Sequence, residues 1–211
     1  MKIFAENYLA LLNGELKGLN LTRIINPEEF FVKQILDSIM PLKLCKQFKR
    51  SLDSNLPLID VGFGGGFPLL PLAKLYPEKL FIGFEARKKK ADAVELVTER
   101  LNINNVKIYH QRLEDVEFDI PAILTFKAVG DIKQLLQMIC GIKQQWAYFY
   151  KGPRCDEKED IKDKMLDWKK VSDLEYKLDK TNGRRLLGFK GVTVPRGTKS
   201  NKSLVKLSKL V

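Results

Sequence analysis

Short apolar runs alternate with stretches of helical periodicity over the middle of this chain, and the alternation predicts its architecture. Runs that suit buried strands lie at 58–61, 79–84, 106–110, 120–126 and 146–150. Apolar residues three or four positions apart predict intervening helices at 69–75, 88–101 and 131–143. Because parallel strands need a crossover connection, usually a helix, this order predicts a doubly wound, mostly parallel α/β sheet.

The amino-terminal part is predicted to be helical. Residues 4–19 show imperfect helical spacing. Asn26-Pro27-Glu28-Glu29 has the features of a helix start, with Asn26 as the N-cap and Glu29 in a capping box. This helix continues through Ile39, and residues 43–55 are interpreted as a link. The sequence thus predicts a helical extension over residues 1–55 that packs on, or extends, the α/β domain.

The carboxyl-terminal part is predicted to add an antiparallel element. A charged helix is expected over 156–168, and Asn182-Gly183 favours a hairpin turn between strands at 171–178 and 185–192. The α/β domain therefore ends in an antiparallel hairpin and spans residues 56–194. A basic tail, residues 195–211, follows it.

A glycine-rich turn follows the first strand directly. Segment 60–67 reads Asp-Val-Gly-Phe-Gly-Gly-Gly-Phe, and Pro68 suits the first position of the next helix. A dinucleotide fingerprint needs a small residue where Phe67 stands, so a nicotinamide cofactor is disfavoured. Glu85 ends the second strand about 20 residues further on, where an acid can accept both ribose hydroxyls. This order resembles motif I of class I S-adenosyl-L-methionine (SAM) methyltransferases. Its glycines Gly62, Gly64 and Gly66 are the predicted cofactor loop, with Glu85 as the ribose acid.

The charge of the chain points to a polyanionic partner. It carries 37 Lys and Arg against 26 Asp and Glu, a net charge of +11. The segment 87–90 reads Arg-Lys-Lys-Lys, and residues 183–211 contain eight cationic residues and no acid. A solvated basic face is the alternative, but nucleic acid is favoured as the partner.

Several classes of protein are disfavoured. Three widely spaced cysteines suit neither a disulfide framework nor a metal site and are expected to be buried thiols, and the sole histidine, His110, cannot make a zinc site alone. No apolar run approaches the roughly 20 residues that cross a bilayer. We expect a cytoplasmic, monomeric protein without metal or membrane attachment.

Further motifs resemble a known family, the ribosomal RNA small subunit methyltransferase G family, also called glucose-inhibited division protein B. The resemblance covers roughly residues 19–190. Its segments are Leu19–Thr22, Pro27, Gln34–Ser38, Asp60–Pro68, Arg112–Glu114, Phe118–Asp119, Lys127-Ala128 and Lys151-Gly152. Two positions depart from the family pattern, which has His where Gln34 stands and Arg where Lys127 stands, and Lys lacks the planar fork of Arg.

The resemblance implies a class I, Rossmann-like fold and transfer of a methyl group from SAM to N7 of a guanine in the 530 loop of 16S rRNA. It implies that Gly62, Phe67, Leu113 and Glu114 contact SAM. Lys127, at the end of the fourth strand, is placed beside the cofactor or an RNA phosphate. No general base is expected, because guanine N7 has an available lone pair, and catalysis would rest on positioning. Candidates for contact with 16S rRNA or the small subunit are Lys151, Arg154, Arg184 and Arg185.

Two alternatives stay open at this stage. The chain could be a SAM-dependent methyltransferase of another RNA or of a small molecule. It could also be a non-catalytic RNA-binding protein.

Overall fold

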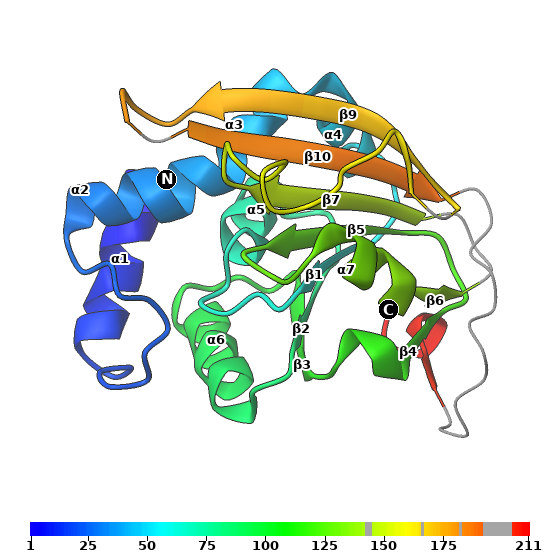
Figure 1. Ribbon diagram of the computed structural model, residues 1–211. Coiled ribbons are helices and arrows are strands. Elements are labelled where there is room, and N and C mark those ends of the chain that lie inside the picture. Colours follow the sequence, from blue (N-terminus) through cyan, green and yellow to red (C-terminus); the bar gives the residue numbers. More distant parts are fainter. Residues whose placement is uncertain (142–144, 166, 182, 192–203) are drawn as a thin grey trace.

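An eight-stranded sheet forms the centre of the molecule (Figure 1). The structure is a computed structural model that describes residues 1–141, 145–165, 167–181, 183–191 and 204–211. The strand order is β3-β2-β1-β5-β7-β10-β9-β8. The bounds are β1 Leu58–Val61, β2 Phe81–Glu85, β3 Val106–His110, β5 Ala122–Lys127, β7 Gln145–Lys151, β8 Lys164–Met165, β9 Trp168–Lys177 and β10 Gly183–Gly191.

The five strands predicted for the α/β domain are confirmed, and all five are parallel. Strands β7, β10 and β9 then pair in antiparallel fashion, which confirms the predicted terminal hairpin. Its turn residue Asn182 and the predicted strand end at Val192 lie outside the described residues. Since β10 runs opposite to its neighbour, its first residues lie at the edge where the parallel strands end.

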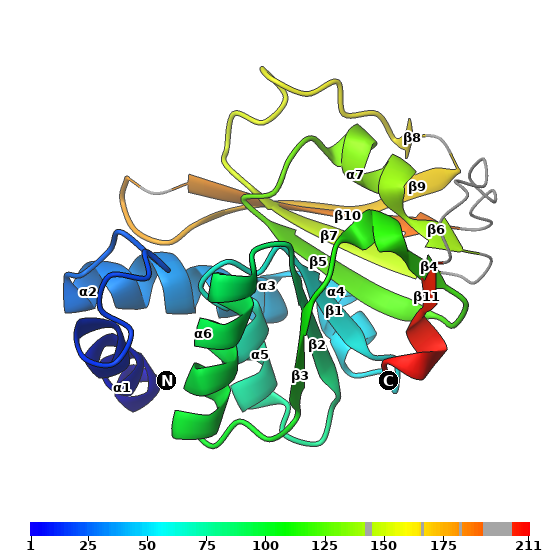
Figure 2. The same cartoon turned by 90° about the horizontal axis from the view of Figure 1, so that it is seen from below.

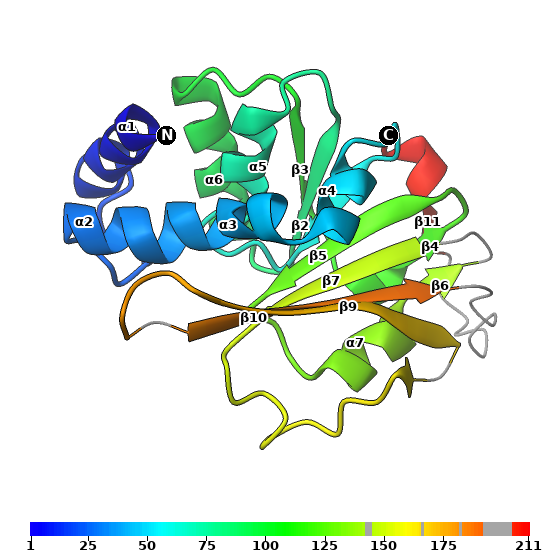
Figure 3. The ribbon, with the colours of Figure 1, turned by 90° about the horizontal axis from the view of Figure 1, so that it is seen from above.

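Helices cover both faces of the sheet, which explains why the central strands are almost continuously apolar (Figure 3). Helices α5 (Leu69–Leu75) and α6 (Lys88–Arg100) lie on one face, and α7 (Ile132–Met138) lies on the other. Side chains alternate along β1 between the two cores, so that Leu58 joins the α5 side and Ile59 the α7 side. Helix α7 is shorter than the predicted 131–143. It is followed by β6 (Cys140–Gly141), and residues 142–144 are not described.

The amino-terminal helices extend the α5 side of the molecule (Figures 1 and 3). Asn26 is the N-cap as predicted, because its side chain accepts a hydrogen bond from the Glu29 N–H at 2.9 Å. Residues 43–55, interpreted from the sequence as a link, contain a further helix that Cys45 caps through its sulfur. Buried side chains of these helices share one core with α5 and α6. The helices are α1 Lys2–Asn13, α2 Pro27–Phe30, the π-helix η1 Phe31–Leu36, α3 Asp37–Leu44 and α4 Lys46–Leu52.

The charged helix predicted over 156–168 is wrong. The described residues of this segment form turns and then β8. One of its carboxylates explains the difference: Glu159 accepts hydrogen bonds from the Ile132 N–H at 2.8 Å and from Lys151 Nζ at 2.5 Å. These contacts with the start of α7 and the end of β7 replace the local helical pattern.

The last residues return to the domain rather than extending away from it. The described end, 204–211, contains β11 (Val205–Lys206) and the 3₁₀-helix η3 (Leu207–Lys209). Strand β11 pairs with β4 (Val116–Phe118) in a small second sheet that also includes β6 (Figure 2). Leu207 is fully buried, so this part of the predicted tail is structural. Within the described residues, no helix is both long and apolar enough to cross a bilayer.

Candidate functional site

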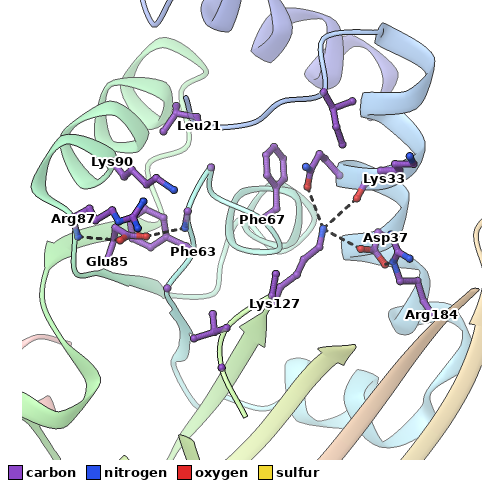
Figure 4. A pocket seen from close by; sticks show the side chains of 18 residues that line it. Leu21, Lys33, Asp37, Phe63, Phe67, Glu85, Arg87, Lys90, Lys127 and Arg184 are labelled. Atoms are coloured by element: carbon purple, nitrogen blue, oxygen red, sulfur yellow. Dashed lines mark hydrogen bonds and ion pairs between the residues drawn. The ribbon is translucent and has the colours of Figure 1, made fainter. Parts of the chain in front are cut away.

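A pocket of about 640 Å³ opens at the edge where the parallel strands end (Figure 4). This volume falls in the usual range for small-molecule sites. Five cationic side chains and two carboxylates face it, an excess of positive charge. Its lining comprises Leu21, Ile24, Lys33, Gln34, Asp37, Gly62–Gly65, Phe67, Glu85, Arg87, Lys90, Lys127–Gly130 and Arg184.

The glycine loop after β1 forms one wall of the pocket. Gly62 has φ +67°, and a Cβ atom there would also lie 2.9 Å from the Val129 side chain, so the position requires glycine. At Gly65 a Cβ would lie 2.9 Å from the Leu21 carbonyl oxygen. The loop is therefore enclosed between the turn after β5 and the amino-terminal segment, with its backbone close to any ligand.

The fully buried Asp60 fixes the start of the helix that follows the loop. Its carboxylate accepts hydrogen bonds from the Leu69 N–H at 3.1 Å and from Thr125 Oγ1 at 2.9 Å. Burial raises the pKa of Asp60 to about 7, although these two hydrogen bonds act to lower it. Asp60 does not line the pocket, so its role is to connect β1, β5 and α5 beneath the ligand.

Glu85 lies at the end of β2 and faces the glycine loop (Figure 4). One carboxylate oxygen accepts from the Gly64 N–H at 3.1 Å and the other from the Arg87 N–H at 3.0 Å. Both bonds orient the carboxylate toward the pocket, and it can accept further hydrogen bonds from a diol. This is the arrangement expected for an acid that holds ribose.

A polar cluster lies on the other side of Phe67 from Glu85 (Figure 4). We call Gln34, Asp37, Lys127, Tyr176 and Arg184 the Asp37 cluster. The Asp37 carboxylate, 2% exposed, lies 3.0 Å from Lys127 Nζ and 3.3 Å from Arg184 Nε, and Tyr176 donates to it at 3.1 Å. Burial lowers the pKa of Lys127, although the negative charge of Asp37 acts to raise it.

The π-helix η1 supplies two further oxygens to this cluster. Lys127 Nζ donates to the Lys33 carbonyl and to Gln34 Oε1, both at 3.2 Å. The wider turn of a π-helix leaves carbonyl groups without their usual α-helical partners, and such turns are frequent at functional sites. The two departures noted in the sequence, Gln34 and Lys127, are therefore in direct contact.

An aromatic cluster joins the amino-terminal helices to the pocket. The Phe67 ring lies 5.3 Å from Tyr8 and 5.6 Å from Phe30, and Lys127 Nζ is 5.9 Å from its centre. The buried Tyr8 hydroxyl donates to the Gly65 carbonyl at 2.6 Å. Residues from α1 and α2 thus support the glycine loop from outside.

The structure brings together six of the predicted site residues and separates the others. Around the pocket lie Gly62, Gly64, Phe67, Glu85, Lys127 and Arg184. Outside its lining lie Gly66, the buried Leu113, and the exposed Glu114, which is 3.6 Å from Arg112.

Three predicted RNA contacts also lie outside the pocket lining. Lys151 is paired with Glu159, and Arg185 with Asp156 and Asp173, its side chain only 10% exposed. Arg154 is 80% exposed at the surface. The sole histidine, His110, is exposed, and among the described residues no group of three or more metal-ligating side chains occurs.

Four charged residues of the pocket lining were not predicted as site residues: Lys33, Asp37, Arg87 and Lys90. The basic run at 87–90 was a visible signal for two of them, since it directly follows the ribose acid. Asp37 falls in the family-like segment Gln34–Ser38, but its role was not predicted, because its partners are far away in the sequence.

The sheet order, the glycine loop after β1 and the acid after β2 define a class I SAM-dependent methyltransferase fold. Solved structures agree on the fold. The magnesium protoporphyrin IX methyltransferase of Synechocystis PCC 6803, solved with bound SAM, aligns with a TM-score of 0.56 at 14% identity, over 89% of this chain and 97% of that one. A putative methyltransferase from Escherichia coli aligns with a TM-score of 0.52 at 7% identity, over 74% and 85%.

The particular family follows from the sequence. The family model described as rRNA small subunit methyltransferase G matches residues 2–187, and the chain belongs to this family. Proteins of that name from Syntrophobacter fumaroxidans and Mycoplasma mobile are 30% and 31% identical, over 89% and 88% of this chain. The chain spans 37% of the length of the first relative and 81% of the second.

Proposed function

We propose that this protein transfers a methyl group from SAM to N7 of a guanine in the 530 loop of 16S rRNA. The observation that carries the proposal is one pocket with two chemically different ends. A glycine loop with a ribose acid forms one end, and the cationic Asp37 cluster forms the other. The first end suits a nucleoside cofactor, and the excess of cations suits a nucleic acid.

The residues present fit SAM. Glu85 would accept the ribose hydroxyls, and the backbone of Gly62 and Gly64 would lie against the cofactor, since neither has a side chain in the way. Phe67 forms the wall between the two ends of the pocket (Figure 4). The adenosine would therefore lie over β1 and β2, and the reacting end would point toward β5 and the Asp37 cluster.

SAM supplies an electrophilic methyl group on a positively charged sulfonium. Attack by the N7 lone pair, in line with the breaking S–CH₃ bond, leaves a neutral thioether and moves the positive charge to the purine. No proton is transferred, so the site needs alignment and exclusion of water rather than a general base. This agrees with a described pocket whose carboxylates, Asp37 and Glu85, are both engaged in hydrogen bonds.

Contacts with the RNA are proposed for the cations around the pocket. Arg87 and Lys90 lie beside the glycine-loop end of the pocket, which we call the cofactor end. Arg184 lies at the Asp37-cluster end, where the acceptor base would bind and which we call the acceptor end. The exposed Arg154 can meet a phosphate. Lys151 and Arg185 are each paired with a carboxylate. We therefore propose that the RNA contacts the surface around these two residues rather than their side chains.

The test is methyl transfer from labelled SAM to small-subunit RNA or particles that lack their own modification, followed by mapping of the labelled base. We expect label at N7 of a single guanine in the 530 loop. A matched RNA with 7-deazaguanosine at that position should accept no label.

Other outcomes would replace the proposal. Label at another site or on a small molecule would assign a different methyltransferase substrate. SAM binding by calorimetry without any label would retain the cofactor but remove the substrate. RNA binding without SAM binding would favour a non-catalytic RNA-binding protein.

A further inference from the structure

The Asp37 cluster holds two cations on one carboxylate, and they differ in the donors that they keep for a ligand. An ammonium group has three N–H donors. Lys127 Nζ has three oxygens around it, from Asp37 at 3.0 Å and from Lys33 and Gln34 at 3.2 Å. Its donors are therefore all used within the protein.

Arg184 is different. Its guanidinium has five N–H donors. Nε lies 3.3 Å from Asp37 Oδ1, and Nη1 donates to the Gly183 carbonyl at 3.0 Å. Three N–H groups thus remain without a protein acceptor in the described part of the chain, although the side chain is only 26% exposed and lines the pocket. Donors that are half-buried and unused are available for a ligand.

The sheet order places Arg184 on the acceptor side. The ribose acid Glu85 ends β2, and β1, β5 and β7 lie between β2 and β10. At about 4.8 Å per strand, the backbone of Arg184 lies on the order of 19 Å across the sheet from that of the ribose acid. With the ribose held at Glu85, the base presented beyond the methyl group is the ligand on the Arg184 side of the pocket.

We propose that Arg184 binds O6 of the target guanine and thereby selects guanine over adenine, with Asp37 as its positioning residue. This inference rests on the proposed function. A base that offers N7 to the methyl group also turns O6, on the same edge, toward the same wall of the site. Adenine has an amino donor there instead, which would face the Arg184 donors and leave them unpaired.

The other pocket cations suit this role less well. Lys33 forms an ion pair with Glu29 at 2.6 Å. Arg87 and Lys90 come from the start of α6, beside Glu85 at the cofactor end (Figure 4). Asp37 fixes the Arg184 fork because the buried Tyr176 hydroxyl holds the same carboxylate oxygen at 3.1 Å.

The experiment compares two target RNAs, one with guanosine and one with 2-aminopurine at the methylated position. 2-Aminopurine keeps N7 but lacks O6. For Arg184→Gln we expect kcat/KM on the guanosine RNA to fall about 10- to 100-fold, the usual value of a base-edge contact. On the 2-aminopurine RNA the same substitution should have little further effect. Arg184→Lys, which keeps the charge without the fork, should recover part of the loss.

Lys90→Gln is the matched control, since it removes a pocket cation at the cofactor end. It should lower kcat/KM by the same factor on both RNAs. Asp37→Asn should shrink the preference for guanosine over 2-aminopurine, a ratio that a general loss of folded protein does not change.

An equal loss on both RNAs for Arg184→Gln would overturn the inference and assign the residue to a phosphate. If Arg184→Gln weakened SAM binding, measured by calorimetry, by the same factor as it lowers kcat/KM, the inference would also be overturned. Arg184 would then be assigned to the carboxylate of the methionine moiety of SAM. If the unmodified protein methylates no guanine at all, the proposed function fails instead, which is a separate result.

Discussion

At the residue scale, Asp60 couples the fold to pH. Burial raises its pKa to about 7, so between pH 4 and 7 the folded protein holds a proton that the unfolded chain releases. Stability from this group is greatest at low pH and falls as pH rises toward 7. Relative to Asp60→Asn, the wild-type free energy of unfolding should fall by about 2–3 kcal/mol between pH 5 and pH 8. Urea denaturation at several pH values measures this difference.

Asp53→Asn is the control for this experiment. A hydrogen bond from Lys49 lowers the pKa of Asp53, so its contribution changes only below the tested range. Its difference from wild type should be constant between pH 5 and pH 8. A constant difference for Asp60→Asn as well would show that Asp60 is ionised throughout.

A second residue-scale prediction concerns Glu85. The substitution Glu85→Gln keeps the size of the side chain but replaces one acceptor oxygen by a donor, opposite the Gly64 N–H or a ribose hydroxyl. Loss of a charged hydrogen bond should weaken SAM binding about 10- to 100-fold, measured by calorimetry. Glu99→Gln, on the exposed end of α6, should bind SAM as wild type does. Equal affinity of both variants would limit Glu85 to holding the loop.

At the scale of elements, α1 is predicted to act on the cofactor through the glycine loop. Tyr8→Phe keeps the ring packed against Phe67 but leaves the Gly65 carbonyl without its donor. The loop should lose its fixed orientation, and SAM affinity should fall severalfold, while stability falls by about 1–3 kcal/mol. Calorimetry and urea denaturation of the same samples separate the two effects.

Tyr148→Phe provides the matched control, because its hydroxyl is hydrogen-bonded to Ser51 at 2.7 Å, away from the pocket lining. It should lower stability without changing SAM affinity. If both variants weaken SAM binding in proportion to their lost stability, α1 has only a structural role.

The elements also show what the sequence could and could not reveal. The strands around Leu58, the glycine loop and Glu85 were predictable because each depends on a pattern within a few residues. The Asp37 cluster was not, since it joins residues 37, 127, 176 and 184 and depends on a π-helix with no sequence signal of its own. The helix prediction for the charged segment 156–168 was wrong for a related reason. Glu159 accepts hydrogen bonds from α7 and β7, which are distant in the sequence, instead of supporting a local helix.

At the scale of the whole molecule, the distribution of the +11 charge matters more than its size. A net positive charge attracts any polyanion from a distance, whereas contacts that release counterions must lie at the interface. Arg87 and Lys90 line the pocket, while Lys46 and Arg50 are exposed on α4 and do not line it. These two pairs therefore separate local contact from overall charge.

The double substitutions Arg87→Gln/Lys90→Gln and Lys46→Gln/Arg50→Gln both lower the net charge from +11 to +9, a loss of two charges each. Binding of the target RNA, followed by fluorescence anisotropy at increasing salt, gives the slope of log K against log salt. The pocket pair should reduce the slope by about 1.4–1.8, because each phosphate contact contributes about 0.7–0.9. The α4 pair should leave it unchanged, since neither of its side chains lines the pocket over which the RNA is proposed to bind. Equal slopes for the two variants would mean that the RNA does not pass over the pocket, and would place its binding surface elsewhere on the molecule.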